Sequence, residues 1–288
     1  MRWAAVLVLA MSASAWWAPG PASAVPLPTI TGVVKVEAPS PNNSAMAKSA
    51  TVTCPTGKRL INAGGYIVGG GGNVGMDDIF PDLTANSVTV TGKETDSLTT
   101  NWWVSAVATC ADEPAGLELI WVESTVSSFY LKQATATCTG NKTLLGSGAT
   151  IEGGAGEAIL DAIAPNGGAG IPATSVTVQA FESDPLADDW TASAFAICAD
   201  PLRGQQRLSD STAFDSANNG ARAQCTDQVA TGTGAEIVGV TGEVVIDNEY
   251  PIDGSATTAP TATTVYGQEE DATTGSWYIT AFALCADA

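Results

Sequence analysis

Three pairs of acidic residues recur at the same place in this sequence and have the chemistry to bind a cation. Each pair has the pattern Glu-x-Asp, and each glutamate lies sixteen residues before a cysteine that ends a repeat. Side chains alternate between the two faces of a β-strand, so residues i and i+2 point the same way. On a strand, both carboxylates of a pair therefore share one face. The pairs are Glu94/Asp96, Glu182/Asp184 and Glu269/Asp271.

A further acid recurs four residues before a repeated proline, at Asp77, Asp161 and Asp247. If the loop that carries it meets the Glu-x-Asp pair, each repeat presents three carboxylates. Together with backbone carbonyls and water, these would suit Ca²⁺, which takes six to eight oxygen ligands. The simpler interpretation is that the acids end strands and cap turns. Paired carboxylates also serve glycosidases, but three equal active sites are not what an enzyme needs. We therefore predict no catalytic residue and leave Ca²⁺ as the one possible cofactor.

Tryptophan is the second repeated feature. Trp102, Trp190 and Trp277 each precede the closing cysteine by eight residues, a fixed distance that favours a core position against a disulfide, as in immunoglobulin-type domains. Four other aromatic residues have no counterpart of like size in the other repeats, and we predict that they form an interface or binding surface. They are Trp103, Trp121, Phe129 and Tyr130.

The cysteines define the repeat that positions these residues. Cys54, Cys138 and Cys225 open the repeats, and Cys110, Cys198 and Cys285 close them. Pairing within each repeat gives Cys54–Cys110, Cys138–Cys198 and Cys225–Cys285, which we prefer. Joining Cys110 to Cys138, Cys198 to Cys225 and Cys54 to Cys285 would instead suit a closed ring. The repeats divide the chain into units 29–112, 113–200 and 201–288.

The local pattern within a unit is that of β-strands. Segments such as 49–54, 87–92 and 103–110 alternate or are rich in Val, Thr, Ile and aromatic residues. Glycines and prolines interrupt them every eight to twelve residues, the spacing of sandwiches and barrels. We predict an all-β protein of three homologous, disulfide-stapled, β-sandwich-like modules in tandem. The alternative is a single pseudo-threefold β-prism.

Two resemblances accompany this pattern. The run Cys54-Pro55-Thr56-Gly57-Lys58, followed by Gly64-Gly65 and closed by Trp102 and Cys110-Ala111, resembles a module common in secreted bacterial proteins of unknown function. Cys54-Pro55-x-Gly57 with Asp77-Asp78 also resembles the vitelline membrane outer layer proteins, whose three repeats form a β-prism. The first resemblance covers all three units and implies no activity. The second departs from this chain, because units two and three lack both motifs.

The first 24 residues have the features of an export signal. Arg2 precedes an apolar run from Ala4 to Met11, and Ala22-Ser23-Ala24 provides small residues for cleavage. The apolar run is too short to span a bilayer. We therefore expect a secreted protein, in a compartment where disulfides form.

Charge and composition exclude several functions. The sequence has 11 basic and 30 acidic residues, a formal net charge of −19, and no histidine. Such a surface repels nucleic acid, and the missing histidine removes serine and cysteine triads and histidine metal sites. We predict an exported, non-catalytic binding or structural protein of the cell surface or extracellular space. Its partner would be an extracellular protein or glycan, without membrane insertion. The alternative is a carboxylate-dependent glycan hydrolase.

Overall fold

The computed structural model describes residues 26–240 and 242–288, and the predicted export signal lies outside them. The described residues form strands and turns without any helix, so the predicted all-β class is confirmed. It follows that no described segment is a helix long and apolar enough to cross a membrane.

Each of the three units contributes six strands. Unit one contains β1 (Val34–Pro39), β2 (Ala47–Thr53), β3 (Arg59–Val68), β4 (Val74–Asp82), β5 (Ser87–Glu94) and β6 (Trp103–Ala111). Unit two contains β7 (Glu118–Glu123), β8 (Leu131–Thr137), β9 (Thr143–Glu152), β10 (Ala158–Asn166), β11 (Ser175–Glu182) and β12 (Thr191–Ala199). Unit three contains β13 (Gln206–Ser211), β14 (Asn219–Gln224), β15 (Val229–Val238), β16 (Val244–Ile252), β17 (Ala262–Glu269) and β18 (Tyr278–Ala286).

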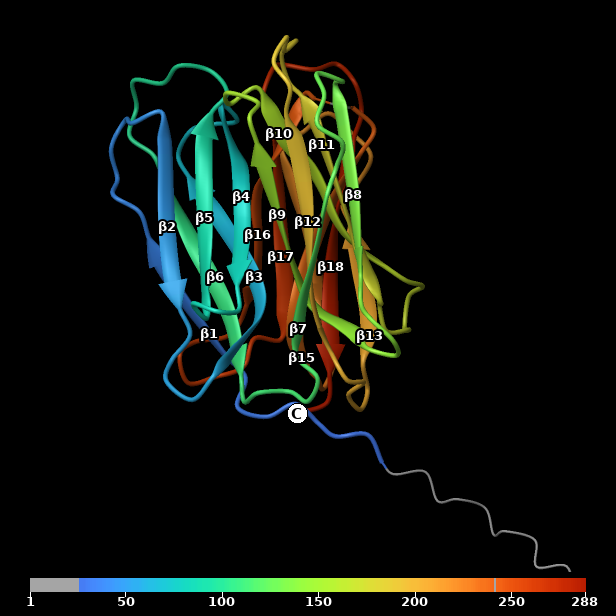
Figure 1. The fold of residues 1–288 in the computed structure, drawn as a ribbon. Coiled ribbons are helices and arrows are strands. Elements are labelled where there is room, and N and C mark those ends of the chain that lie inside the picture. The colour runs from blue at the N-terminus through green and yellow to red at the C-terminus, as the bar shows by residue number, and fades with distance from the viewer. Residues whose placement is uncertain (1–25, 241) are drawn as a thin grey trace, which may run out of the picture.

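The strands form three six-stranded sheets, and every sheet is shared by two units (Figure 1). The orders are β1-β6-β3-β16-β17-β14, β2-β5-β4-β9-β12-β7 and β13-β18-β15-β10-β11-β8. At each junction, β3 with β16, β4 with β9 or β10 with β15, only two residue pairs are in register. The three modules are therefore β units, as predicted. They are not separate domains, because they share sheets and close into one threefold arrangement.

Glycine allows this closure, because the junction brings two backbones into contact. A Cβ on Gly148 in β9 would lie 2.4 Å from the carbonyl oxygen of Ile79 in β4. Any side chain at this position would therefore push the two units apart. The equivalent glycines at the other junctions are Gly64, 2.6 Å from the Glu249 carbonyl oxygen, and Gly234, 2.6 Å from that of Ile163.

The disulfides join the two half-sheets of each module. Cys54 follows β2 in one sheet and Cys110 lies on β6 in another. The bonds are the three predicted within repeats, Cys54–Cys110, Cys138–Cys198 and Cys225–Cys285, with Cα–Cα distances of 5.8, 5.7 and 5.7 Å. No free cysteine remains, and the alternative pairing between repeats is not found. Three disulfides favour an oxidising environment.

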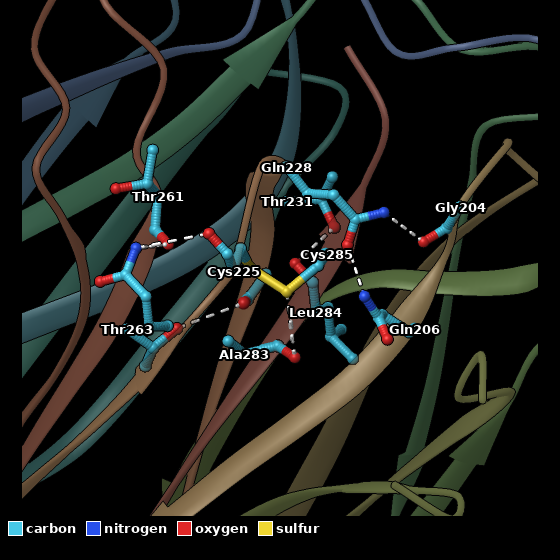
Figure 2. Close-up of a disulfide and its surroundings, with 12 residues drawn as sticks. Gly204, Gln206, Cys225, Gln228, Thr231, Thr261, Thr263, Ala283, Leu284 and Cys285 are labelled. Atoms are coloured by element: carbon cyan, nitrogen blue, oxygen red, sulfur yellow. Dashed lines mark hydrogen bonds between the residues drawn. A yellow bond between two sulfur atoms is a disulfide. The ribbon is translucent and has the colours of Figure 1, made fainter. Parts of the chain in front are cut away.

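Several polar groups around the third disulfide are hydrogen-bonded to one another (Figure 2). Cys225 and Cys285 are both buried. Beside them the Thr231 hydroxyl donates to the Leu284 carbonyl oxygen at 3.1 Å, and the Gln228 amide donates to the Gly204 carbonyl oxygen at 2.7 Å. A buried disulfide with bonded neighbours is shielded from thiols in solution.

Candidate functional site

The glutamate of each Glu-x-Asp pair is bonded to the repeated tryptophan. Glu94 ends β5 and its Oε1 accepts the indole N–H of Trp102 at 2.8 Å, while Oε2 accepts the backbone N–H of Leu98 at 3.1 Å. The three tryptophans are buried, as predicted. The glutamates thus satisfy indole donors in the core. The equivalent indole bonds run from Trp190 to Glu182 at 2.9 Å and from Trp277 to Glu269 at 3.3 Å.

A buried lysine completes this group in two modules. The ammonium of Lys48 lies 3.4 Å from the centre of the Trp102 ring, and that of Lys132 lies 5.0 Å from the Trp190 ring. Burial lowers the pKa of Lys48, and the negative charge of Glu94 opposes that change. Unit three has Asn219 at the corresponding position, six residues before its opening cysteine. The Glu–Trp–Lys group is therefore structural and incomplete in module three.

The aspartates of the three pairs lie beyond the strand ends and are exposed, which agrees with the simpler interpretation that these acids end strands. The alternative, a strand face shared by both carboxylates of a pair, is wrong. Asp96 accepts a hydrogen bond from the Asn73 amide at 3.1 Å. Burial raises the pKa of Glu270 to about 7, and Asp271, Asp96 and Asp184 add to this effect through their negative charges. The aspartates from all three modules are thus near one glutamate at the same end of the molecule.

The third set of acids lies on β-bulges in the middle of strands, and not in loops. Asp77, Asp161 and Asp247 are the extra residues at the register shifts of β4, β10 and β16. Burial raises their pKa values to about 7, 8 and 7. Residues 26–240 and 242–288 contain no group of three carboxylates arranged to hold a metal ion. The predicted Ca²⁺ set is therefore divided among three different surroundings.

One sheet has an open groove of about 960 Å³ on its outer face. The groove runs across β5, β4, β9, β12 and β7, and so crosses the junction between units one and two. Its floor includes the bulge residue Asp77 and its neighbour Asp78. The junction between repeats thus creates a concave surface that neither repeat would have alone.

Aromatic rings form the apolar part of the groove. Trp121 on β7 is 59% exposed and stacks on Phe195 of β12, with ring centres 6.5 Å apart and planes at 22°. Phe80 of β4 meets Phe195 edge-on at 5.4 Å. Phe195 is itself buried, so it supports the two more exposed rings. Trp121 therefore presents a fixed aromatic plane to solvent.

Charged groups line the remainder of the groove. The Lys93 ammonium lies 2.9 Å from Asp77 Oδ2. Burial is the main cause of the raised pKa of Asp77, Asp78 raises it further, and Lys93 opposes both. Burial also raises the pKa of Asp78. Glu123 and Glu152, both exposed, add two more carboxylates. The groove is thus rich in hydrogen-bond acceptors and acidic overall.

The other two sheets differ at the equivalent positions. Trp121 pairs with Phe195, whereas the corresponding pairs are Glu37 with Val107 and Ser209 with Phe282. On the third sheet the Arg207 guanidinium lies 4.7 Å from the centre of the Phe282 ring and covers it. Among these three equivalent pairs, an exposed tryptophan on a buried phenylalanine therefore occurs only on the face shared by units one and two.

The remaining predicted binding residues lie elsewhere. Trp103 is half-buried on another sheet, edge-on to Tyr66 at 5.6 Å. Phe129 and Tyr130 are exposed just before β8, with ring centres 4.7 Å apart. Of the four, only Trp121 lines the groove. Phe80, Phe195 and Lys93 were missed, although strand alternation places Phe195 on the outer face of β12.

Comparison with known proteins adds no assignment, since no protein-family model and no curated protein matches this sequence. The groove and its chemistry are therefore the basis for a function.

Proposed function

We propose that this chain is an exported, non-catalytic glycan-binding protein, and that the groove across β4, β9, β12 and β7 holds the sugar. The observation that carries this proposal is the exposed ring of Trp121, held in place by Phe195. Ligand sites combine aromatic or apolar walls with a few polar groups that fix orientation. A flat indole stacks on the apolar face of a pyranose ring, and carboxylates such as Asp78 and Glu123 accept its hydroxyl donors.

Charge narrows the class of glycan. The chain has a net charge of −19, and the groove contains four carboxylates against the ammonium of Lys93. Anionic polysaccharides would be repelled. The groove is open and crosses five strands, which fits a chain of several sugar units better than a monosaccharide. We therefore favour a neutral or amino-sugar oligosaccharide.

Hydrolysis is the second candidate, and the pKa of Asp77 favours it. A value of about 7 would let a carboxyl act as a general acid at neutral pH, with another carboxylate as the base. However, Asp161 and Asp247 have similarly raised pKa values at the same bulge position in the other units. A property shared by all three repeats fits the fold better than one active site, so binding remains the preferred function.

Calorimetric titration with neutral and amino-sugar oligosaccharides tests the proposal. Binding should weaken by at least about tenfold in Trp121→Ala, because interface tryptophans commonly contribute 2 kcal/mol or more. Trp121→Tyr, which keeps an aromatic plane, should retain most of the affinity. Trp103→Ala is the matched control, since Trp103 lies on another sheet, and its affinity should be unchanged.

The same titrations separate the two candidates. Reducing ends should not accumulate during prolonged incubation if the protein only binds. Turnover abolished by Asp77→Asn would instead establish the hydrolase. No binding of any oligosaccharide by the folded wild-type protein would contradict the proposed function altogether.

A further inference from the structure

Strand β7 is an edge strand that differs from its two counterparts, β1 and β13. Each of the three lies at the edge of its sheet beside the strand that carries the closing cysteine. The backbone N–H of Lys35 in β1 donates to the Ser255 carbonyl oxygen at 2.8 Å. In β13, the N–H of Arg207 donates to the Ile171 carbonyl oxygen at 3.0 Å. Two of the three edges are thus covered by a loop from the neighbouring unit.

The outer side of β7 has no such cover. Ser124 donates its N–H to the Ala192 carbonyl oxygen of the β7–β12 pair, and backbone groups alternate in direction along a strand. Leu119, Trp121 and Glu123 therefore turn their N–H and C=O groups away from β12. Within residues 26–240 and 242–288, no backbone hydrogen bond reaches these groups. They form a free row of donors and acceptors.

The length of one loop explains the difference. The covering loops comprise residues 167–174, between β10 and β11, and 253–261, between β16 and β17. The equivalent loop between β4 and β5 has only residues 83–86. In this short loop the Asn86 side chain accepts the backbone N–H of Leu60 at 2.8 Å, where the longer loops use a backbone carbonyl. The short loop thus leaves β7 open, while Asn86 keeps the local hydrogen bond.

The surface beside this edge is apolar and acidic. Trp121, Val122 and Val126 are 59%, 38% and 61% exposed, and Glu123 lies at the end of the strand. The opposite sheet edges, β2, β8 and β14, expose mostly polar side chains. Open edges are usually blocked by lysine or proline or by a covering segment, and β7 has none of these. An edge that is open, apolar and acidic is suited to an added strand.

We propose that β7 is a docking edge to which an extended, basic segment of another protein adds as a further strand. Its backbone would pair with Leu119, Trp121 and Glu123, its apolar side chains would lie beside Leu119 and Trp121, and a lysine or arginine would face Glu123. A second copy of this chain is disfavoured, because two molecules of net charge −19 repel each other. The side chains of Leu119, Trp121 and Glu123 also line the groove, but the docking is carried by their backbone groups and is tested in the absence of glycan.

The test uses the blocked hexapeptide Lys-Thr-Ile-Thr-Val-Lys and NMR titration of the folded, full-length protein. In antiparallel pairing, its first, third and fifth amides face β7, and the amide signals of Leu119, Trp121 and Glu123 should shift. N-methylation of the third and fifth amides removes two pairing donors and should weaken binding about tenfold or more. N-methylation of the second and fourth amides, which face away, is the matched control and should leave binding intact.

Two protein variants address the edge itself. Leu119→Pro removes an N–H that faces away from β12, a position where an edge strand tolerates proline. Replacement of residues 83–86 by the sequence of residues 167–174 should restore the covering loop. NMR spectra should show that both variants fold, and both should lose peptide binding. Trp103→Ala, on another sheet, should keep it.

Equal affinity of the two N-methylated peptides would overturn the proposal, as would binding retained by both folded variants. Light scattering tests whether a second copy of this chain occupies the edge instead. A wild-type dimer that becomes monomeric in Leu119→Pro would assign the edge to a second copy. Monomeric wild-type protein is the expected result.

Discussion

Replacement of Glu249 by glutamine should make the stability of the protein less sensitive to a rise in pH from 5 to 8. Glu249 lies on β16 at the centre of the molecule and is 1% exposed. Its Oε1 accepts the Thr233 hydroxyl at 2.9 Å, whereas Oε2 is buried without a partner among the described residues. Units one and two have Ile79 and Ile163 at this position. One unit therefore places a carboxyl where the other two place a hydrocarbon.

Burial raises the pKa of Glu249 to about 8 from its usual 4.5, although the bond from Thr233 opposes this. Between these two values the folded protein holds a proton that the unfolded chain has released. Stability therefore falls as pH rises through this range, by about 1.4 kcal/mol for each pH unit. From pH 5 to pH 8 the loss from Glu249 alone is about 4 kcal/mol. Other buried acids, such as Asp161, add losses of the same sign.

Urea unfolding of wild-type protein and Glu249→Gln at pH 5 and pH 8 measures this contribution. The wild type should lose more stability between the two pH values, and the difference should approach about 4 kcal/mol. Because the other acids are present in both proteins, their contributions cancel. Glu113→Gln, at an exposed position between units, is the control and should follow the wild type. An unchanged pH dependence in Glu249→Gln would refute the reasoning.

Further variants test the repeated structural groups. Glu94→Ala removes the acceptor of the Trp102 indole and leaves Lys48 without its nearby charge, so it should lower the free energy of unfolding in urea by about 2 kcal/mol or more. Glu269→Ala should cost less, because its indole bond is longer and no lysine of unit three covers Trp277. Equal losses would contradict the role of the lysine. Gly148→Ala places a Cβ 2.4 Å from the Ile79 carbonyl oxygen and should destabilise the junction by about 1–3 kcal/mol, whereas an unchanged melting temperature would show that the strands can separate without cost.

The fold class and the disulfides could be predicted because both depend on local or repeated signals. Alternation identifies strands such as β6, and equivalent cysteines limit the pairing. The sharing of sheets could not be predicted with the same certainty. Strand β3 pairs with β6 on one side, and its sequence does not indicate whether the strand on its other side comes from its own unit or, as found, is β16 of unit three. The strongest signal of this sharing was the recurrence of Gly64, Gly148 and Gly234, which is explained only once a facing carbonyl is known.

The groove was predictable only in part. Trp121 was singled out because the other repeats lack an equivalent, and it does line the groove. Phe195 was not predicted to be a binding residue, because Phe282 occupies the same position in the next unit and Phe195 therefore resembles a repeated structural residue. Of the two interpretations of Glu-x-Asp, the one that places these acids at strand ends agrees with the structure, because strands such as β5 end at the glutamate. The shared strand face was wrong for the same reason. The eight-residue distance from Glu94 to Trp102 was the signal that linked them.

The sharing of sheets also determines when the protein can be complete. Glu249 pairs with Gly65 across the junction of β16 and β3, two residues 249 − 65 = 184 positions apart. During synthesis or export the half-sheet β1-β6-β3 must therefore wait, with its inner edge unpaired, until the last repeat arrives. Closing so long a loop is slow, and the waiting edge is exposed to wrong partners. Once closed, however, no repeat can leave without breaking two sheets, so the three should unfold together in a single transition.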